Sequence, residues 1–88
     1  MSDDRTIYTI RDESGESSSI TLEKLVADVL QESLPNVHEW VQRTYDRVTE
    51  KKPELGRRQK GDLVRLLSMR EAEKSPRFKE MIDELFGL

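Results

Sequence analysis

The 88-residue sequence contains no cysteine, which excludes disulfide bonds, thiolate chemistry and zinc sites with cysteine ligands. It has no apolar run near the roughly 18 residues that span a bilayer, so we expect no contact with a membrane. Its first residues, MSDDRTIYTI, do not show the basic segment and following apolar segment of a secretory signal. These absences favour a cytoplasmic protein.

Catalytic and cofactor-binding patterns are also missing. The four glycines form neither GxGxxG nor GxxxxGK[ST], the loops that bind nucleotide phosphates. The single histidine, His38, has only its neighbour Glu39 as a nearby carboxylate, and adjacent helix residues point about 100° apart. Glu80, Asp83 and Glu84 offer oxygen ligands for Mg²⁺, but an acidic solvent-exposed face explains them more simply. We therefore expect no enzyme activity, no cofactor and no metal site.

The apolar residues that are present have regular spacing. They make up 34% of the chain against 38% charged residues, but their periodicity favours a folded protein over a disordered one. A chain of this length makes one small domain, 1–88. We predict a mainly α, α+β fold: a short N-terminal β-hairpin followed by a compact bundle of three to four helices. Segments 1–4 and 12–19 are expected to be flexible.

The hairpin is predicted from strand-like residues on either side of a turn. RTIYTIR, residues 5–11, is rich in β-branched and aromatic residues and places Tyr8 and Ile10 on one face. DESGESSS is a turn signal around Gly15. A second strand at 18–21 would close the hairpin, with only Ile20 to bury.

The first two helices are predicted from apolar stripes and capping residues. The first is expected at 22–33, with Thr21 as its N-cap, and Pro35 ends that segment. The second follows Asn36 as N-cap, with Glu39 three residues later in a capping-box-like pair.

The last two helices are predicted in the same way. The third is expected from Lys60 or Asp62 to about residue 74, and Asp62 fits the N-cap role. Its core face is predicted to contain three leucines, Leu63, Leu66 and Leu67. The fourth begins with Ser75 and Pro76 as N-cap and first helical residue, and Gly87 ends it.

The net charge of −3 conceals blocks of opposite charge. Residues 1–42 carry three cations and nine acids, 43–79 carry twelve cations and six acids, and 80–88 carry three acids and no cation. Such asymmetry creates a field that attracts partners. The middle block supplies the candidate partner- or anion-binding residues, expected on one exposed surface: Arg43, Arg47, Lys51, Arg57, Arg58, Lys60 and Arg65. Lys52 extends this surface, and Arg70 is expected opposite the leucines of its helix.

The stretch GRRQKGDLVRLL, residues 56–67, places cations just before a helix, whose start already favours an anion. It resembles the second half of a SAP-type DNA-binding motif, in which glycine and basic residues lead into K-x-D-L-V-x-x-L. The matching residues are Lys60, Asp62, Leu63, Val64 and Leu67, and the resemblance implies contact with DNA. The helix that precedes this half in the motif has no counterpart, because KKPELG is too short and contains Pro53. We therefore do not assign the family.

The fourth predicted helix carries more apolar surface than a small monomer needs. Five large apolar residues lie on one face: Phe78, Met81, Ile82, Leu85 and Phe86. An exposed apolar face of this kind indicates a protein partner or a second copy of the chain. The alternative is that the helix completes the core.

Three functions remain open. We favour a small non-enzymatic regulatory or adaptor protein that binds a protein partner through a charge-polarised surface and the apolar C-terminal helix. The first alternative is binding of nucleic acid by the basic surface over 43–65, against which the flanking acidic blocks count. The second is a subunit of a homo-oligomer with no separate ligand.

Overall fold

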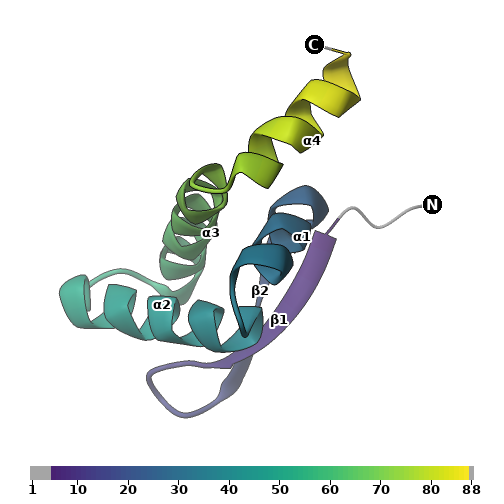
Figure 1. The fold of residues 1–88 in the computed structure, drawn as a ribbon. Helices are drawn as coiled ribbons and strands as arrows, with labels where there is room; N and C mark the ends of the chain where they lie inside the picture. Colours follow the sequence, from purple (N-terminus) through teal and green to yellow (C-terminus); the bar gives the residue numbers. More distant parts are fainter. Residues whose placement is uncertain (1–4, 88) are drawn as a thin grey trace.

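A computed structural model describes residues 5–87 (Figure 1). Within this range an antiparallel hairpin precedes four helices. The elements are β1 (Arg5–Arg11), β2 (Ser17–Glu23), α1 (Lys24–Ser33), α2 (Val37–Lys51), α3 (Arg57–Glu73) and α4 (Pro76–Phe86). The prediction of a mainly α, α+β fold with an N-terminal hairpin is confirmed. The flexibility predicted for 1–4 concerns residues outside the described range. None of the helices within 5–87 has the length and apolar character needed to span a membrane.

The hairpin follows the predicted alternation. Tyr8 and Ile10 are buried, whereas Ile7 between them is 61% exposed. The second strand is longer than predicted, because Leu22 continues the core face of Ile20 and belongs to the strand. The helix start predicted at Leu22 and the N-cap predicted at residue 21 are therefore wrong, and α1 begins without a side-chain cap.

The turn between the strands is held by one carboxylate. Asp12 Oδ1 accepts hydrogen bonds from the backbone N–H groups of Ser14 and Glu16, both at 3.0 Å. Gly15 has φ = 87°, a conformation that side chains disfavour, so glycine suits this turn. The structure thus gives the first part of 12–19 a hydrogen-bonded conformation, and its flexibility stays a prediction.

The predicted caps of α2 and α4 are confirmed. Asn36 Oδ1 accepts from the backbone N–H of Glu39 at 2.9 Å, and Ser75 Oγ accepts from the N–H two residues later at 3.2 Å. Gly87 ends α4 in the left-handed conformation. The Glu39 carboxylate pairs with Arg43 instead of completing a capping box.

α3 differs from the prediction at its start. It begins at Arg57 after Gly56, whose N–H donates to Gln59 Oε1 at 3.1 Å. The side chain of Gln59, in the first turn of α3, thus accepts a backbone N–H at the start of the helix. The helix therefore begins at an earlier residue than predicted. The N-cap role predicted for Asp62 is therefore wrong.

α3 also presents a different face to the core. Its buried residues, spaced four apart, are Lys60, Val64, Ser68 and Ala72. Leu66 is 63% exposed, and Leu63 and Leu67 are only partly buried. Because serine and alanine are small, this face lets α3 pack closely on its neighbours, and the prediction that all three leucines form the core face is wrong.

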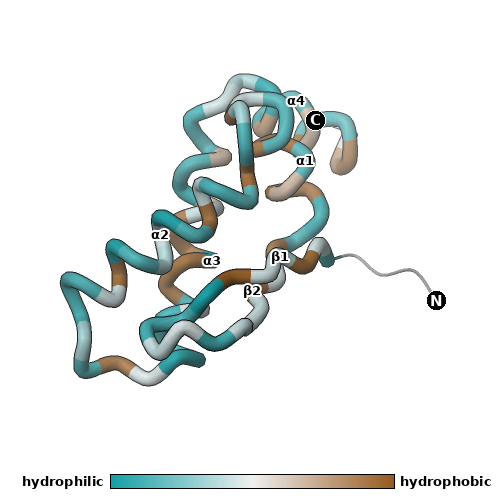
Figure 2. The backbone as a smooth tube through the Cα atoms, turned by 90° about the horizontal axis from the view of Figure 1, so that it is seen from below, coloured by the Kyte–Doolittle hydropathy of each residue, from teal (hydrophilic) through white to brown (hydrophobic). Residues whose placement is uncertain are grey.

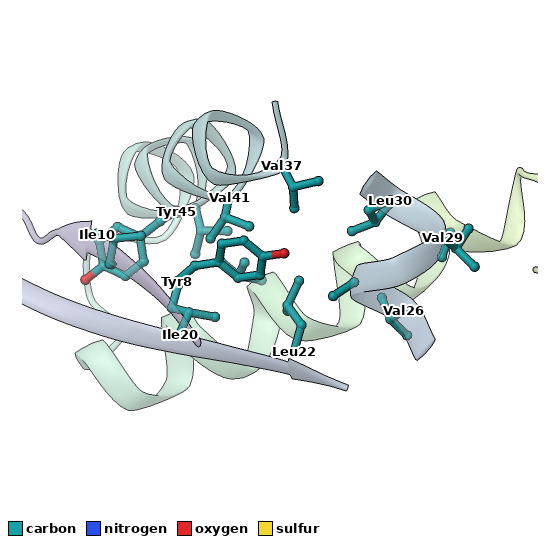
Figure 3. Close-up of a cluster of buried hydrophobic side chains, with 14 residues drawn as sticks. Tyr8, Ile10, Ile20, Leu22, Val26, Val29, Leu30, Val37, Val41 and Tyr45 are labelled. Atoms are coloured by element: carbon teal, nitrogen blue, oxygen red, sulfur yellow. The ribbon is translucent and has the colours of Figure 1, made fainter. Parts of the chain in front are cut away.

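One apolar cluster joins the hairpin to α1, α2 and α3. Figure 3 shows Tyr8 of β1 and Ile20 of β2 facing Val41 of α2. The helices themselves are mostly hydrophilic with short apolar stretches between (Figure 2), so each supplies a narrow stripe to the cluster. α4 has no buried residue and extends away from the end of α3 (Figure 1).

Candidate functional site

A groove of about 560 Å³ lies between α2 and α3. Apolar and small side chains line its interior: Trp40, Thr44, Val48, Leu63 and Leu67. Six cations and one acid complete the lining: Arg43, Arg47, Lys51, Lys52, Arg70, Lys74 and Glu71. We call this site, made of these twelve residues, the basic groove.

Helical spacing explains why these side chains meet. On α2, Trp40, Thr44, Arg47 and Lys51 are separated by four, three and four positions, which keeps them on one face. Positions 63, 67 and 70 of α3 and its C-cap residue Lys74 have the same spacing. Two matching stripes therefore face the groove from opposite sides.

The cations of the basic groove are mostly uncompensated. Arg43 pairs with Glu39, and Lys74 pairs with Glu71 at 3.1 Å. The other four, which have no ion-pair partner among residues 5–87, are Arg47, Lys51, Lys52 and Arg70. Like charges four positions apart on a helix repel, so an anion bound here would relieve unfavourable electrostatics.

The basic groove brings together only part of the predicted surface. It contains Arg43, Arg47 and Lys51, and also Arg70, which lies on the same side of α3 as Leu63 and Leu67 rather than opposite them. Three other predicted cations line a second hollow of about 350 Å³ beside β2: Arg57, Arg58 and Arg65. Two of these three cations have an acidic partner, because Arg57 lies 3.7 Å from Asp12 and Arg65 pairs with Asp62.

Lys60 is the predicted site residue that does not reach the surface. Its side chain is 1% exposed, and Nζ donates to Glu13 Oε2 at 2.7 Å. Tyr45 OH donates to Oε1 of the same carboxylate at 2.7 Å. Buried lysines need such an anionic partner. The prediction that Lys60 belongs to an exposed anion-binding surface is therefore wrong, and we call Lys60, Glu13 and Tyr45 the Glu13 triad.

The pKa values of Glu13 and Tyr45 in the Glu13 triad shift in opposite directions. The hydrogen bond from Lys60 and that from Tyr45 lower the pKa of Glu13 from 4.5 to about 2. Burial, followed by the bond to the Glu13 carboxylate, raises the pKa of Tyr45 from 10.0 to about 12. The folded protein thus favours an ionised Glu13 and a neutral Tyr45 phenol.

These shifts predict a loss of stability in acid. A carboxyl group with a lowered pKa in the folded state stabilises the fold above its unfolded pKa of 4.5, and this contribution disappears as pH falls to about 2. The difference in melting temperature between wild type and Glu13→Gln is therefore expected to shrink over that interval. Thermal denaturation followed by circular dichroism checks this, and a difference that stays constant would contradict it.

The predicted apolar face of α4 divides in two. Phe78 and Met81 are partly buried against the core cluster. Leu85 and Phe86, further along, are 60% and 72% exposed. Ile82 lies between these halves and is partly exposed. The second half of this face is thus available for contacts.

The polar residues considered for catalysis or for a metal site have structural contacts. His38 Nε2 hydrogen-bonds to the carbonyl of Thr9, and the imidazole stacks on Tyr8 with ring centroids 6.4 Å apart. Arg77 lies 3.4 Å from Glu80 and 3.8 Å from Glu84. No group of three or more His, Cys, Asp or Glu side chains suited to a metal ion occurs within residues 5–87.

Sequence reasoning missed the α3 half of the basic groove. The signal was present as the spacing of Leu63, Leu67, Arg70 and Lys74, but the leucines were interpreted as core residues. Of the residues that match the SAP-type motif, Lys60 is not available for contact with DNA, because its side chain is buried and pairs with Glu13. Comparison of the chain with protein-family models, curated proteins and solved structures finds no match.

Proposed function

We propose that this protein is a small non-enzymatic adaptor that binds an acidic, amphipathic helix of a partner protein in the basic groove. The observation that carries the proposal is the combination of an apolar interior with four cations that have no ion-pair partner among the described residues. An occupant with an apolar stripe would cover Trp40 and the leucines, while its acids meet the cations. We expect it to act in the cytoplasm.

The apolar interior favours a helix over nucleic acid. Phosphate binding needs cations on an exposed surface but gains little from leucines beneath them. In the basic groove, Trp40, Leu63 and Leu67 are partly buried and accessible from the groove. Aromatic anchors of this kind are typical of the centre of protein interfaces.

The test uses a fluorescent model peptide with leucines at helical positions i, i+3, i+4 and i+7 and glutamates elsewhere. Trp40 is the only tryptophan of the chain, so its emission reports occupancy of the basic groove. We expect saturable binding by fluorescence anisotropy together with a change in Trp40 emission. Reversing three unpaired cations, Arg47→Glu, Lys51→Glu and Arg70→Glu, is expected to weaken binding at least about tenfold, or about 1.4 kcal/mol.

The matched control reverses three exposed cations outside the basic groove: Arg11→Glu, Arg58→Glu and Lys79→Glu. This variant has the same net charge as the groove variant and is expected to retain most of the affinity. Equal weakening in both variants would show a non-specific charge effect and contradict the proposal. Tighter binding of a DNA duplex than of the peptide, falling steeply with salt, would instead support a nucleic-acid function.

A further inference from the structure

The outer half of α4, from Ile82 to Phe86, is acidic and amphipathic, and most of its apolar surface is exposed to solvent. Leu85 and Phe86 are exposed, and Ile82 precedes them by one turn. Residues 80–88 carry three acids, Glu80, Asp83 and Glu84, and no lysine or arginine. This segment therefore has the apolar stripe and the negative charge that the basic groove accommodates.

The base of α4 is fixed to the body, so the outer half projects in a defined direction. Phe78 and Met81 pack against the core cluster, and Arg77 lies 3.6 Å from Glu32 at the end of α1. The end of α4 extends beyond the other elements (Figure 1). Because the base of α4 is anchored, the exposed apolar residues Leu85 and Phe86 are available for contact with another molecule.

The basic groove of the same molecule is out of reach of this helix end. Within residues 5–87, α4 packs on α1 and α3 and makes no contact with α2, which forms one wall of the groove. Any α4 that occupies the groove must therefore come from another copy of the chain.

We infer that the outer half of α4 from one copy binds in the basic groove of a second copy. The inference rests on the proposed function, since it makes α4 an example of the acidic helix that the groove binds. Leu85 and Phe86 would cover Trp40 and the leucines, and the acids of α4 would face the arginine and lysine side chains of the groove. Self-association and partner binding then compete for one site.

The experiment compares full-length variants by sedimentation velocity over a range of concentrations. Wild type is expected to increase in mass with concentration, with a parallel change in Trp40 emission. The groove variant, Arg47→Glu, Lys51→Glu and Arg70→Glu, turns six cations and one acid into three cations and four acids. The arm variant, Asp83→Lys and Glu84→Lys, turns three acids into one acid and two lysines. Each variant alone is expected to self-associate at least tenfold more weakly.

Mixing the groove variant with the arm variant is the decisive measurement. The groove variant keeps the native acidic α4, which matches the native basic groove of the arm variant, and the two reversed sites also match each other. An equimolar mixture is therefore expected to regain association although neither variant associates well alone. A third variant, Leu85→Ser with Phe86→Ser, removes the apolar contact without reversing charge and is also expected to self-associate at least tenfold more weakly. These two residues are exposed, and circular dichroism verifies that the fold is kept.

The outcomes separate this inference from the proposed function. A wild type that stays monomeric at every concentration, or a mixture that does not associate, overturns the inference. If the model peptide still binds wild type and not the groove variant, the adaptor function survives that result. If the peptide fails to bind while the copies associate as described, the groove serves self-association and the adaptor function fails.

Discussion

Replacing Lys60 with alanine is expected to lower the free energy of unfolding by about 3 kcal/mol. The side chain is 1% exposed, so alanine removes buried methylene groups at about 0.8 kcal/mol each and leaves a cavity. Lys60→Met retains most of the volume and removes the buried charge, so a change within about 1 kcal/mol is expected. Urea denaturation followed by circular dichroism measures both values. Equal losses in the two variants would show that the ammonium group, rather than the buried chain, supports the fold.

Glu13→Gln provides the control for the ion pair itself. In wild type the substitution leaves a buried ammonium without its anion, whereas in the Lys60→Met background no charge is stranded. Glu13→Gln is therefore expected to destabilise the wild type more than it destabilises Lys60→Met. A double-mutant cycle gives this coupling directly. Additive effects would show that Lys60 and Glu13 do not interact appreciably in solution.

Leu30→Ala is expected to cost about 2–5 kcal/mol, whereas Leu66→Ala should change stability by less than about 0.5 kcal/mol. Both substitutions remove the same atoms from a helix. Leu30 is fully buried in the core cluster, and Leu66 is 63% exposed on the outer side of α3. The same denaturation measurement compares them. A large loss at Leu66 would contradict the orientation of α3 and support the leucine face predicted from the sequence.

Local signals in the sequence predicted the elements that depend on neighbouring residues. Alternation placed Tyr8 and Ile10 on one face of β1, which the structure buries, and Asn36 and Ser75 marked the starts of α2 and α4. These features involve contacts within a few positions of the chain. They are therefore visible in one sequence without knowledge of the fold.

The same reasoning gave the wrong buried face for α3, because that face depends on contacts between residues far apart in the sequence. Hydrophobicity favoured Leu66, but the helix instead buries Ser68 and Ala72, whose small size allows close packing, and Lys60, whose partner lies in the hairpin turn. The orientation of α3 in turn decides which cations join α2 at the basic groove. Hence Arg43, Arg47 and Lys51 were identified as candidates, while the contribution of Arg70 and Lys74 became visible only in the structure.

The Glu13 triad also has a consequence for the order of folding. Its Lys60–Glu13 contact joins residues 47 positions apart, and closing so long a loop carries an entropic cost that a local turn does not. A two-stranded hairpin is marginal by itself in water, so β1 and β2 become stable only when the helices pack against them. We therefore expect the turn to become locked late, in the same kinetic step that docks α3, so that the hairpin does not form as an independent early nucleus.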